Sequence, residues 1–120
     1  MELLLHPDPK GLRLNVRDFT TTPGPRYKRL GNGSGEVFRD TRLAPAFNQA
    51  RQKGVKLVVD LDGTSAYGSS FLEEAFGGLT RLFGKDAVLA VLDLRSEARP
   101  WYLSEVLDEY IPEADSNYAQ

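Results

Sequence analysis

The sequence predicts an α/β domain in which strands and helices alternate along the chain. Two apolar runs, residues 55–61 and 87–94, are rich in the residues typical of buried parallel strands. Amphipathic helical patterns precede, separate and follow these runs. The resulting order is one or two N-terminal strands, helix, strand, helix, strand and helix. It implies right-handed crossovers and a largely parallel sheet with a mixed N-terminal edge.

Composition indicates a single globular domain spanning residues 1–120, because 41% of the residues are hydrophobic and 27% are charged. The chain has no cysteine, which leaves no disulfide or thiolate chemistry and suits the cytoplasm. We find no signal peptide and no apolar run as long as a membrane span. We therefore expect a cytoplasmic protein that does not cross a membrane.

The net charge of −2 is unevenly distributed along the chain. Residues 1–60 contain 11 Lys/Arg and 6 Asp/Glu, whereas residues 61–120 contain 4 and 11. Either half could meet a charged partner, but two solvated faces explain the pattern more simply.

Residues 1–32 are predicted to form an N-terminal strand and loop region. Met1 to Leu5 is either a short strand or an unanchored terminus, ended by the prolines at positions 7 and 9. Residues 12–17 alternate apolar and polar side chains, as in a strand with one wet face. Glu36 to Arg39 is expected to be a further strand.

A first helix is predicted from Asp40 or Thr41, with Pro45 in its first turn and Gly54 at its C-terminus. Its buried stripe consists of Leu43, Phe47 and Ala50. After the strand at residues 55–61, Asp62-Gly63-Thr64 forms a turn. The spacing of apolar residues then predicts a second helix that starts near Ser69 and Ser70. Ser70 and Glu73 fit a capping box, and Gly77-Gly78 indicates either close backbone approach or a local kink.

After the strand at residues 87–94, a last helix is predicted to start within residues 96–100 and to end at Pro112. Its buried side comprises Leu103, Val106, Leu107 and Tyr110. Residues 114–120 are expected to be a frayed polar tail.

Two neighbouring segments, one basic and one glycine-rich, have compositions that occur in nucleic-acid and nucleotide binding sites. Arg26-Tyr27-Lys28-Arg29 interleaves basic and aromatic residues, a pattern found in nucleic-acid binders, but one tetrad in an acidic chain is a weak signal for this function. Residues 31–35 lack the features of either nucleotide-binding fingerprint and are interpreted as a turn.

An apolar strand ending in Asp60-Leu61-Asp62-Gly63-Thr64 resembles the first motif of the haloacid-dehalogenase phosphatases. This resemblance implies that Asp60 is a nucleophile and Asp62 an acid/base around Mg²⁺, with Ser96 in the place of a phosphate-binding hydroxyl. The motif lies in the middle of the chain, and no carboxylate pair follows at a later strand end. Turn-forming and loop-bonding roles for both carboxylates are therefore favoured, and we expect neither a metal nor a cofactor.

Ser69 and Ser70 could act as nucleophiles only with a base in reach, and the sole histidine, His6, lies near the N-terminus. Capping of the second helix accounts for one serine. A hydroxyl at a helix N-terminus is also a favourable place for a phosphate.

Residues 60–64 followed by Tyr67-Gly68-Ser69-Ser70-Phe71-Leu72-Glu73-Glu74-Ala75-Phe76-Gly77-Gly78-Leu79 resemble the STAS-like family of unknown function, which is related to the STAS domains of anti-sigma-factor antagonists. The resemblance extends from about Gly33 to the end of the chain. It implies a four- to five-stranded mixed sheet packed against about three helices, and no catalysis.

STAS proteins act as switches, and the resemblance implies a partner of the GHKL ATPase or sensor-kinase class. The serine at the start of their second helix is phosphorylated by that partner; Ser69 and then Ser70 match it here. The antagonists carry Asp where this chain has Gly68, and glycine where it has Phe71.

We expect the end of the 55–61 strand and the start of the second helix to form an exposed corner. The partner-binding candidates are Asp62, Thr64, Tyr67, Glu73 and Glu74. Tyr67 would anchor the interface, unless it packs over the helix end. The sequence thus favours a non-enzymatic regulatory module that binds a protein. A magnesium-dependent phosphatase and a weak nucleic-acid binder are the alternatives, and the oligomeric state stays open.

Overall fold

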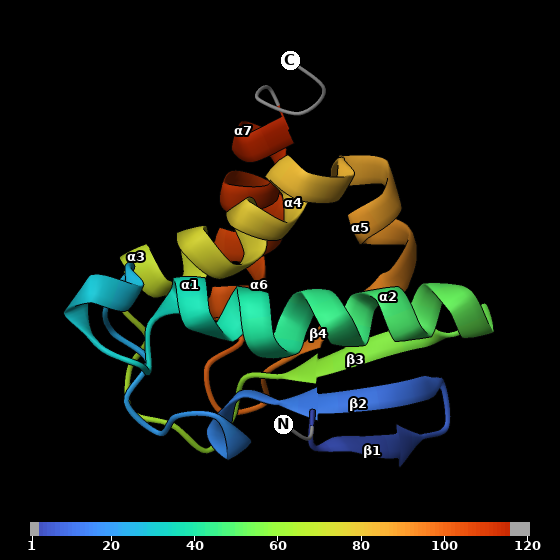
Figure 1. Cartoon of the computed structure of the whole chain (residues 1–120), viewed down its shortest axis with the longest axis horizontal. Coiled ribbons are helices and arrows are strands. Elements are labelled where there is room, and N and C mark those ends of the chain that lie inside the picture. Colours follow the sequence, from blue (N-terminus) through green and yellow to red (C-terminus); the bar gives the residue numbers. More distant parts are fainter. Residues whose placement is uncertain (1–2, 116–120) are drawn as a thin grey trace.

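The computed structural model of the chain describes residues 3–115 and has two layers (Figure 1). A four-stranded mixed sheet in the order β1-β2-β3-β4 forms one layer, and the helices lie against one of its faces. This is the α/β fold expected from the alternation of elements along the chain.

The sheet starts with a hairpin and continues with two parallel pairings. Strand β1 (Leu5–Asp8) runs antiparallel to β2 (Gly11–Asn15). Strands β3 (Lys56–Asp60) and β4 (Leu92–Arg95) follow, each parallel to its preceding neighbour. The prediction that Pro7 ends the first strand is wrong, because Pro7 lies inside β1 and pairs with Leu12. An edge strand tolerates a proline whose missing N–H would point away from the sheet.

Alternation along the strands separates a core face from an open face. The core-facing residues are Leu12, Leu14, Leu57, Val59, Leu92 and Leu94. The open face carries Arg13, Val58, Asp60, Asp93 and Arg95 in adjacent rows. Val58 is fully buried but does not belong to the hydrophobic core cluster. Charged side chains, rather than a second layer of helices, therefore cover it.

The first helix comprises α1 (Gly35–Phe38), a π-helical segment at Arg39–Leu43 and α2 (Ala44–Lys53). It starts earlier than expected, and the predicted strand at Glu36 to Arg39 is wrong. Ser34 is the N-cap, and its Oγ accepts a hydrogen bond from the Val37 N–H at 3.1 Å. The predicted stripe, Leu43, Phe47 and Ala50, is fully buried. The helix ends at Gly54 with φ of 68°, a conformation that favours glycine.

The second helix comprises α3 (Ser69–Leu72), a π-helical segment at Glu73–Gly77 and α4 (Gly78–Phe83). Two structures were expected at Gly77-Gly78, a close approach to another backbone or a local kink. Neither fully describes the helix at these positions. A Cβ on Gly77 would collide with the Glu73 carboxylate, and one on Gly78 would lie 2.5 Å from Arg39 Nη1. The two glycines make room for charged side chains rather than for a neighbouring backbone.

Residues 87–94 were predicted as one strand, but most of them form helix α5 (Lys85–Val91). Only the last three residues of that run, 92–94, belong to the sheet, as part of β4. A short apolar run is compatible with either structure. Here the seven-residue helix carries the chain from α4 back to the sheet, with Val88 buried in the core.

The last helix comprises α6 (Trp101–Ser104), a π-helical segment at Glu105–Tyr110 and α7 (Ile111–Asp115). Three expectations for it are wrong. Pro112 lies inside the helix, Leu107 is exposed, and Ala114 is buried rather than part of a frayed tail. The Asp115 carboxylate accepts a hydrogen bond from the Lys85 N–H at 2.8 Å, which ties this end to α5. Positions 116–120 lie outside the described residues.

Candidate functional site

The loop between β3 and the second helix forms one end of the molecule, which we call the Ser69 corner: residues 20–25, residues 61–70 and the start of α1. Gly63 adopts φ of 89° directly after the strand, as the predicted turn requires. Backbone bonds then join the two loops, from Ser65 N–H to Thr21 O and from Gly68 N–H to Pro23 O, both at 2.8 Å.

The two loops touch where a glycine meets a glycine. A Cβ on Gly68 would lie 2.6 Å from the Gly24 carbonyl oxygen. Gly68 is also the N-cap of the second helix, and no side chain caps this end. The predicted capping box of Ser70 and Glu73 is therefore wrong. Glu73 pairs with arginines instead.

Ser69 is exposed at the first position of the second helix, and Ser70 is half-buried behind it. Within residues 3–115, neither serine hydroxyl has a hydrogen-bond partner, so no structural bond explains either side chain. The amides at a helix start have no carbonyl acceptor inside the helix, which makes this end electropositive.

A second helix N-terminus lies at the same corner (Figure 1). Helix α1 starts at Gly35, whose N–H donates to the Pro25 carbonyl at 2.9 Å. A Cβ on Gly35 would lie 2.6 Å from the Phe71 carbonyl oxygen, so the two helices are in close backbone contact there. The positive ends of both helix dipoles thus point toward the same corner.

Tyr67 belongs to the core and is not the exposed anchor that we expected. Its side chain is 8% exposed, and its hydroxyl donates to the Leu61 carbonyl at 2.8 Å. The Tyr67 N–H in turn donates to the Tyr102 hydroxyl at 2.9 Å. Burial raises the pKa of Tyr67. The alternative interpretation, packing over the helix end, is correct.

Asp62 bonds the loop that follows β4, as the loop-bonding hypothesis predicted. Its carboxylate accepts hydrogen bonds from Ser96 Oγ at 2.9 Å, Glu97 N–H at 2.8 Å and Ala98 N–H at 3.2 Å. Burial opposes the charged form, but these three bonds outweigh it and hold the pKa of Asp62 below its usual value. Thr64 is half-buried, and its carbonyl accepts from Arg99 at 3.0 Å.

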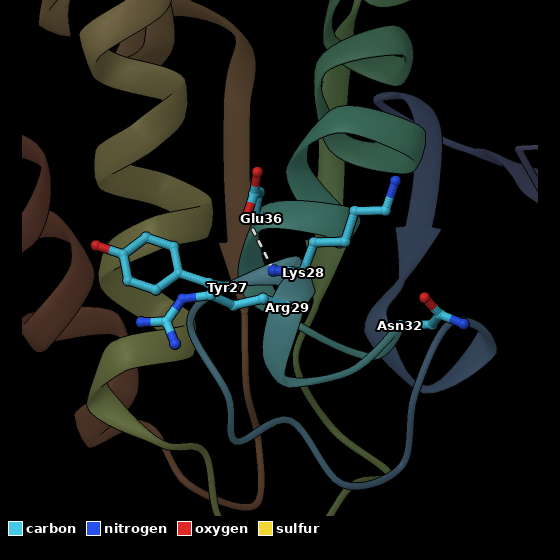
Figure 2. Close-up of a pocket in the computed structure, with 5 residues that line it drawn as sticks. All are labelled: Tyr27, Lys28, Arg29, Asn32 and Glu36. Atoms are coloured by element: carbon cyan, nitrogen blue, oxygen red, sulfur yellow. Dashed lines mark hydrogen bonds between the residues drawn. The ribbon is translucent and has the colours of Figure 1, made fainter.

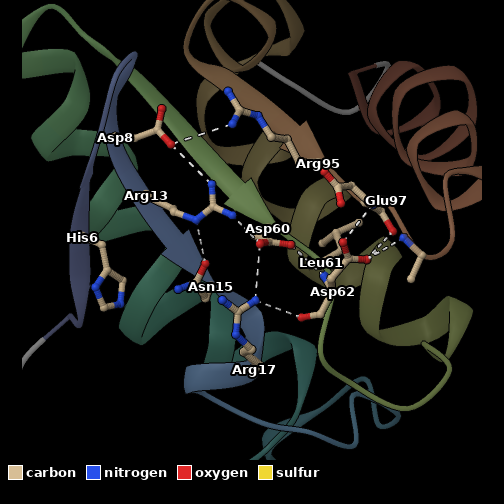
Figure 3. Close-up of polar contacts among 12 residues, drawn as sticks. His6, Asp8, Arg13, Asn15, Arg17, Asp60, Leu61, Asp62, Arg95 and Glu97 are labelled. Carbon is tan, nitrogen blue, oxygen red and sulfur yellow. Dashed lines mark hydrogen bonds and ion pairs between the residues drawn. The ribbon is translucent and has the colours of Figure 1, made fainter.

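Asp60, the other carboxylate of the phosphatase-like motif, lies under two arginines on the open face of the sheet (Figure 3). Its Oδ2 accepts from Arg13 at 2.5 Å and from Arg17 at 3.3 Å, and its Oδ1 accepts from the Asp62 N–H at 2.9 Å. Across residues 3–115, no three metal-ligating side chains gather in one place. The two carboxylates thus have different partners, arginines for Asp60 and the loop after β4 for Asp62, and the Asp62 backbone connects them.

Glu73 and Glu74 share a cluster of ion pairs with Arg26 and Arg39, which lie far away in the sequence, and with Arg81 of the same helix. Glu73 pairs with Arg26 at 2.5 Å and Arg81 at 2.6 Å, and Glu74 pairs with Arg39 at 2.5 Å. Burial opposes ionisation of Glu73, but the hydrogen bonds from Arg81 and Arg26 prevail and lower its pKa. Both glutamates therefore join the second helix to the loop before α1 through Arg26, and Glu74 also joins it to the first helix through Arg39.

The basic tetrad is divided by this cluster, because Arg26 points into it while its neighbours line an open depression (Figure 2). The depression is lined by Tyr27, Lys28, Arg29, Asn32 and Glu36. The Arg29 guanidinium lies 5.4 Å from the centre of the Tyr27 ring. Tyr27, with 41% exposure, is thus an accessible aromatic residue in the segment just before α1.

Sequence reasoning missed several residues that build this end of the molecule. Ser34 was detectable, since a serine just before an apolar stretch with an acid in the first turn is a helix-start signal. The pairing of Arg13 and Arg17 with Asp60 was not detectable, because it depends on the register of β2 against β3.

Within the described part of the chain, no helix has the length and apolarity needed to span a bilayer.

Comparison with known proteins identifies the family of the chain. The sequence profile of the STAS-like domain of unknown function matches residues 34–99, more than half of the chain, including the second helix and Ser69. No similar protein was found among curated sequences, and no similar structure among solved ones. The matched region contains both runs that carried the resemblance, residues 60–64 and residues 67–79. The chain belongs to the family of STAS-like domains of unknown function.

Proposed function

We propose that this chain is a non-enzymatic regulatory module that binds a protein partner through the Ser69 corner. In this proposal, phosphorylation of Ser69 controls binding. The observation that carries it is the state of Ser69 itself: an exposed hydroxyl without a hydrogen bond, at the first position of a helix whose N-cap has no side chain.

The electrostatics of the corner favour an added phosphate. Two helix N-termini meet there, and the positive ends of their dipoles stabilise negative charge. The first amides of α1 are already paired with Pro25, Arg26 and Ser34, so the start of the second helix, which has no side-chain cap, is the end that can bind a phosphate. A phosphate would convert a neutral surface into one carrying about two negative charges. A partner that docks on the unmodified corner would then lose contacts with it. The phosphate would also repel acidic groups of the partner, or would have to be removed from water when the interface forms. Ser70 is the second candidate, but it is less accessible than Ser69.

The surface around Ser69 suits docking rather than catalysis. Its exposed residues are small or polar: Thr21, Thr22, Ser65 and Ala66. Tyr27 and Arg29 border this surface and supply the aromatic and arginine contacts that dominate many interfaces. In contrast, the acidic side chains that could serve a reaction, Asp60 and Asp62, already bind arginines and a loop.

The partner class comes from the family resemblance. STAS switches are phosphorylated by GHKL-type ATPases, so we propose an ATPase or sensor kinase of this class as the partner. The proposal places the protein in the cytoplasm, where ATP is available. The structure gives less support for nucleic-acid binding than the sequence does, because Arg26 of the basic tetrad is paired with Glu73 and Glu74.

The test is an affinity pull-down from the native host with wild type, Ser69→Asp and Ser69→Ala, followed by mass spectrometry of bound proteins and phosphosites. We expect wild type and Ser69→Ala to recover the ATPase, and Ser69→Asp to retain less than about a tenth of it, since a lost or repelled interface contact costs tenfold or more.

A matched control separates an effect on docking from an effect on folding. Ser104→Asp makes the same change at an exposed position of α6 and should not alter binding. Ser69→Asp should melt at or slightly above the wild-type temperature, because an acid in the first turn stabilises a helix. Equal recovery by wild type and Ser69→Asp, with Ser69 unmodified, would contradict the switch.

A further inference from the structure

The outer edge of strand β4 presents unpaired backbone groups. β4 lies at the end of the sheet, with β3 on one side only. The Arg95 carbonyl accepts from the Leu61 N–H at 2.8 Å, so it points toward β3. Backbone groups alternate in direction along a strand, and the N–H and C=O of Leu94 therefore point away from the sheet.

The opposite edge of the sheet is closed to pairing. In the β1-β2 hairpin Asp8 pairs with Gly11 next to the turn, and Pro7 follows opposite Leu12. The outward position at Pro7 has no N–H to donate. Proline is a common means of blocking an edge strand. β4 has no such residue, so the two edges of the sheet differ in what they can accept.

The side chains of β4 are complementary to a second β4 in one antiparallel register. Leu94 faces the helix layer and is half-buried, whereas Asp93 and Arg95 lie on the open face. If Leu94 lies opposite Leu94 of another copy, then each Asp93 lies opposite an Arg95. These outer positions are non-hydrogen-bonded pairs, where side chains approach most closely.

Other registers are unfavourable. A shift by one residue would place leucines and charged residues on the wrong faces. A shift by two would place Asp93 opposite Asp93, or Arg95 opposite Arg95. In the monomer the Arg95 guanidinium points across the sheet toward Asp8 (Figure 3), but its contacts there are long, 3.8 Å to Asp8 and 3.6 Å to Asp93, so it can turn toward the outer edge. Asp93 is held on this face by Lys10 at 2.7 Å.

We propose that two copies of the chain pair through β4 and form a continuous eight-stranded sheet. Two hydrogen bonds join the Leu94 residues, and two ion pairs join Asp93 of each copy to Arg95 of the other. The strand is only four residues long, so the interface is small and the dimer is a weak one. This inference does not depend on the proposed function of Ser69.

The test uses two variants of opposite charge and their mixture. Asp93→Lys places like charges opposite Arg95, and Arg95→Glu places like charges opposite Asp93, so each variant alone should be monomeric. In the mixture, the introduced lysine faces the introduced glutamate, and the remaining Arg95 faces the remaining Asp93. The mixture should dimerise. Sedimentation velocity from about 10 µM to about 1 mM covers the range expected for a small interface.

We expect wild type and the mixture to dimerise with similar dissociation constants, and each variant alone to bind at least tenfold more weakly. Asp86→Lys, the same charge change at an exposed position of α5, should dimerise as wild type does. Hydrogen exchange at the Leu94 amide should slow as the concentration of wild type rises. A monomeric wild type at all concentrations, or a mixture as weak as the separate variants, would overturn the proposal.

Discussion

Asp62 illustrates how one side chain can organise a corner of the molecule. Its carboxylate accepts two backbone N–H groups and one hydroxyl from the loop after β4. Replacing it with asparagine keeps the shape but removes the charge and one acceptor oxygen. We expect Asp62→Asn to lower the free energy of unfolding at pH 7 by about 1–3 kcal/mol, the range for charge-assisted hydrogen bonds. Chemical denaturation of both proteins measures it.

The pH dependence gives the sign of the effect. The folded-state pKa of Asp62 is lowered from 3.8, so its contribution is fully present above that pH and is lost as the pH falls through the lower, folded-state pKa. The difference between wild type and Asp62→Asn should therefore shrink toward zero in acid. A difference that stays constant at low pH would show that the lost charge is not its cause.

At the residue scale, the sequence predicted what is local and missed what depends on contacts across the chain. The loop-bonding role of Asp62 was predictable from its position between a strand and a glycine. The burial of Tyr67 was not, because Tyr102, which accepts its N–H, lies 35 residues later. Ser69 was correctly placed at a helix start, but its lack of a bond required the structure.

The contact between the first two helices depends on Gly35. A Cβ at this position would meet the Phe71 carbonyl oxygen at 2.6 Å and the Phe71 Cα at 3.1 Å, and neither atom can move without the helix. We expect Gly35→Ala to destabilise the protein by about 1–3 kcal/mol, the usual cost of overpacking. The melting temperature should fall accordingly.

Gly77→Ala is the control for Gly35→Ala, because it adds the same methyl group at another helical glycine. An added Cβ there meets the tip of Glu73, which can rotate away, and alanine is the better helix former by about 1 kcal/mol. The stability of this variant should change by less than about 1 kcal/mol. If Gly35→Ala were tolerated equally well, the close contact between the helices would not be rigid.

Elements were predicted best where their pattern is long. The second helix has a full amphipathic repeat, and its start was correct. Residues 36–39, two apolar residues between two charged ones, and residues 87–91, a short apolar stretch, fit a strand or a helix equally well, and both were assigned wrongly. Pro112 misled for another reason: a π-helical segment precedes it, and the looser hydrogen bonding there accommodates a residue without an N–H.

Across the whole molecule, folding brings some of the basic residues of the first half against acidic residues of the second. Lys10 pairs with Asp93, and Arg26 and Arg39 pair with Glu73 and Glu74. Basic residues of the first half thus meet acidic residues of the second. The two solvated faces expected from the charge counts do not describe this arrangement, and the order of charges along the chain could not reveal it.

The open face of the sheet depends on Arg13, which covers Val58 and pairs with Asp60 at 2.5 Å. We expect Arg13→Ala to destabilise the fold by about 2–4 kcal/mol, because it leaves a buried carboxylate with one arginine and exposes an apolar side chain. Urea denaturation measures this loss. Arg13→Met should recover the part due to covering Val58.

Lys28→Ala, at an exposed position, should change stability by less than about 0.5 kcal/mol. A similarly small effect of Arg13→Ala would mean that the charged layer does not stabilise the sheet.

The α/β class and the mixed edge were predictable from element order alone. That all helices lie on one face was not, because the sequence of β3 reads as buried on both sides.

The contact between Gly24 and Gly68 also limits how the sequence of this family can diverge. Any side chain at position 68 would strike the Gly24 carbonyl, so a relative with aspartate there must place the loop of residues 20–25 differently. A Cβ on Gly24 itself would meet no atom within 4 Å, so the restriction falls on position 68, which should be glycine wherever the loop of residues 20–25 has this conformation. Family members with glycine at position 68 would form a branch with their own loop conformation, and with their own set of partners.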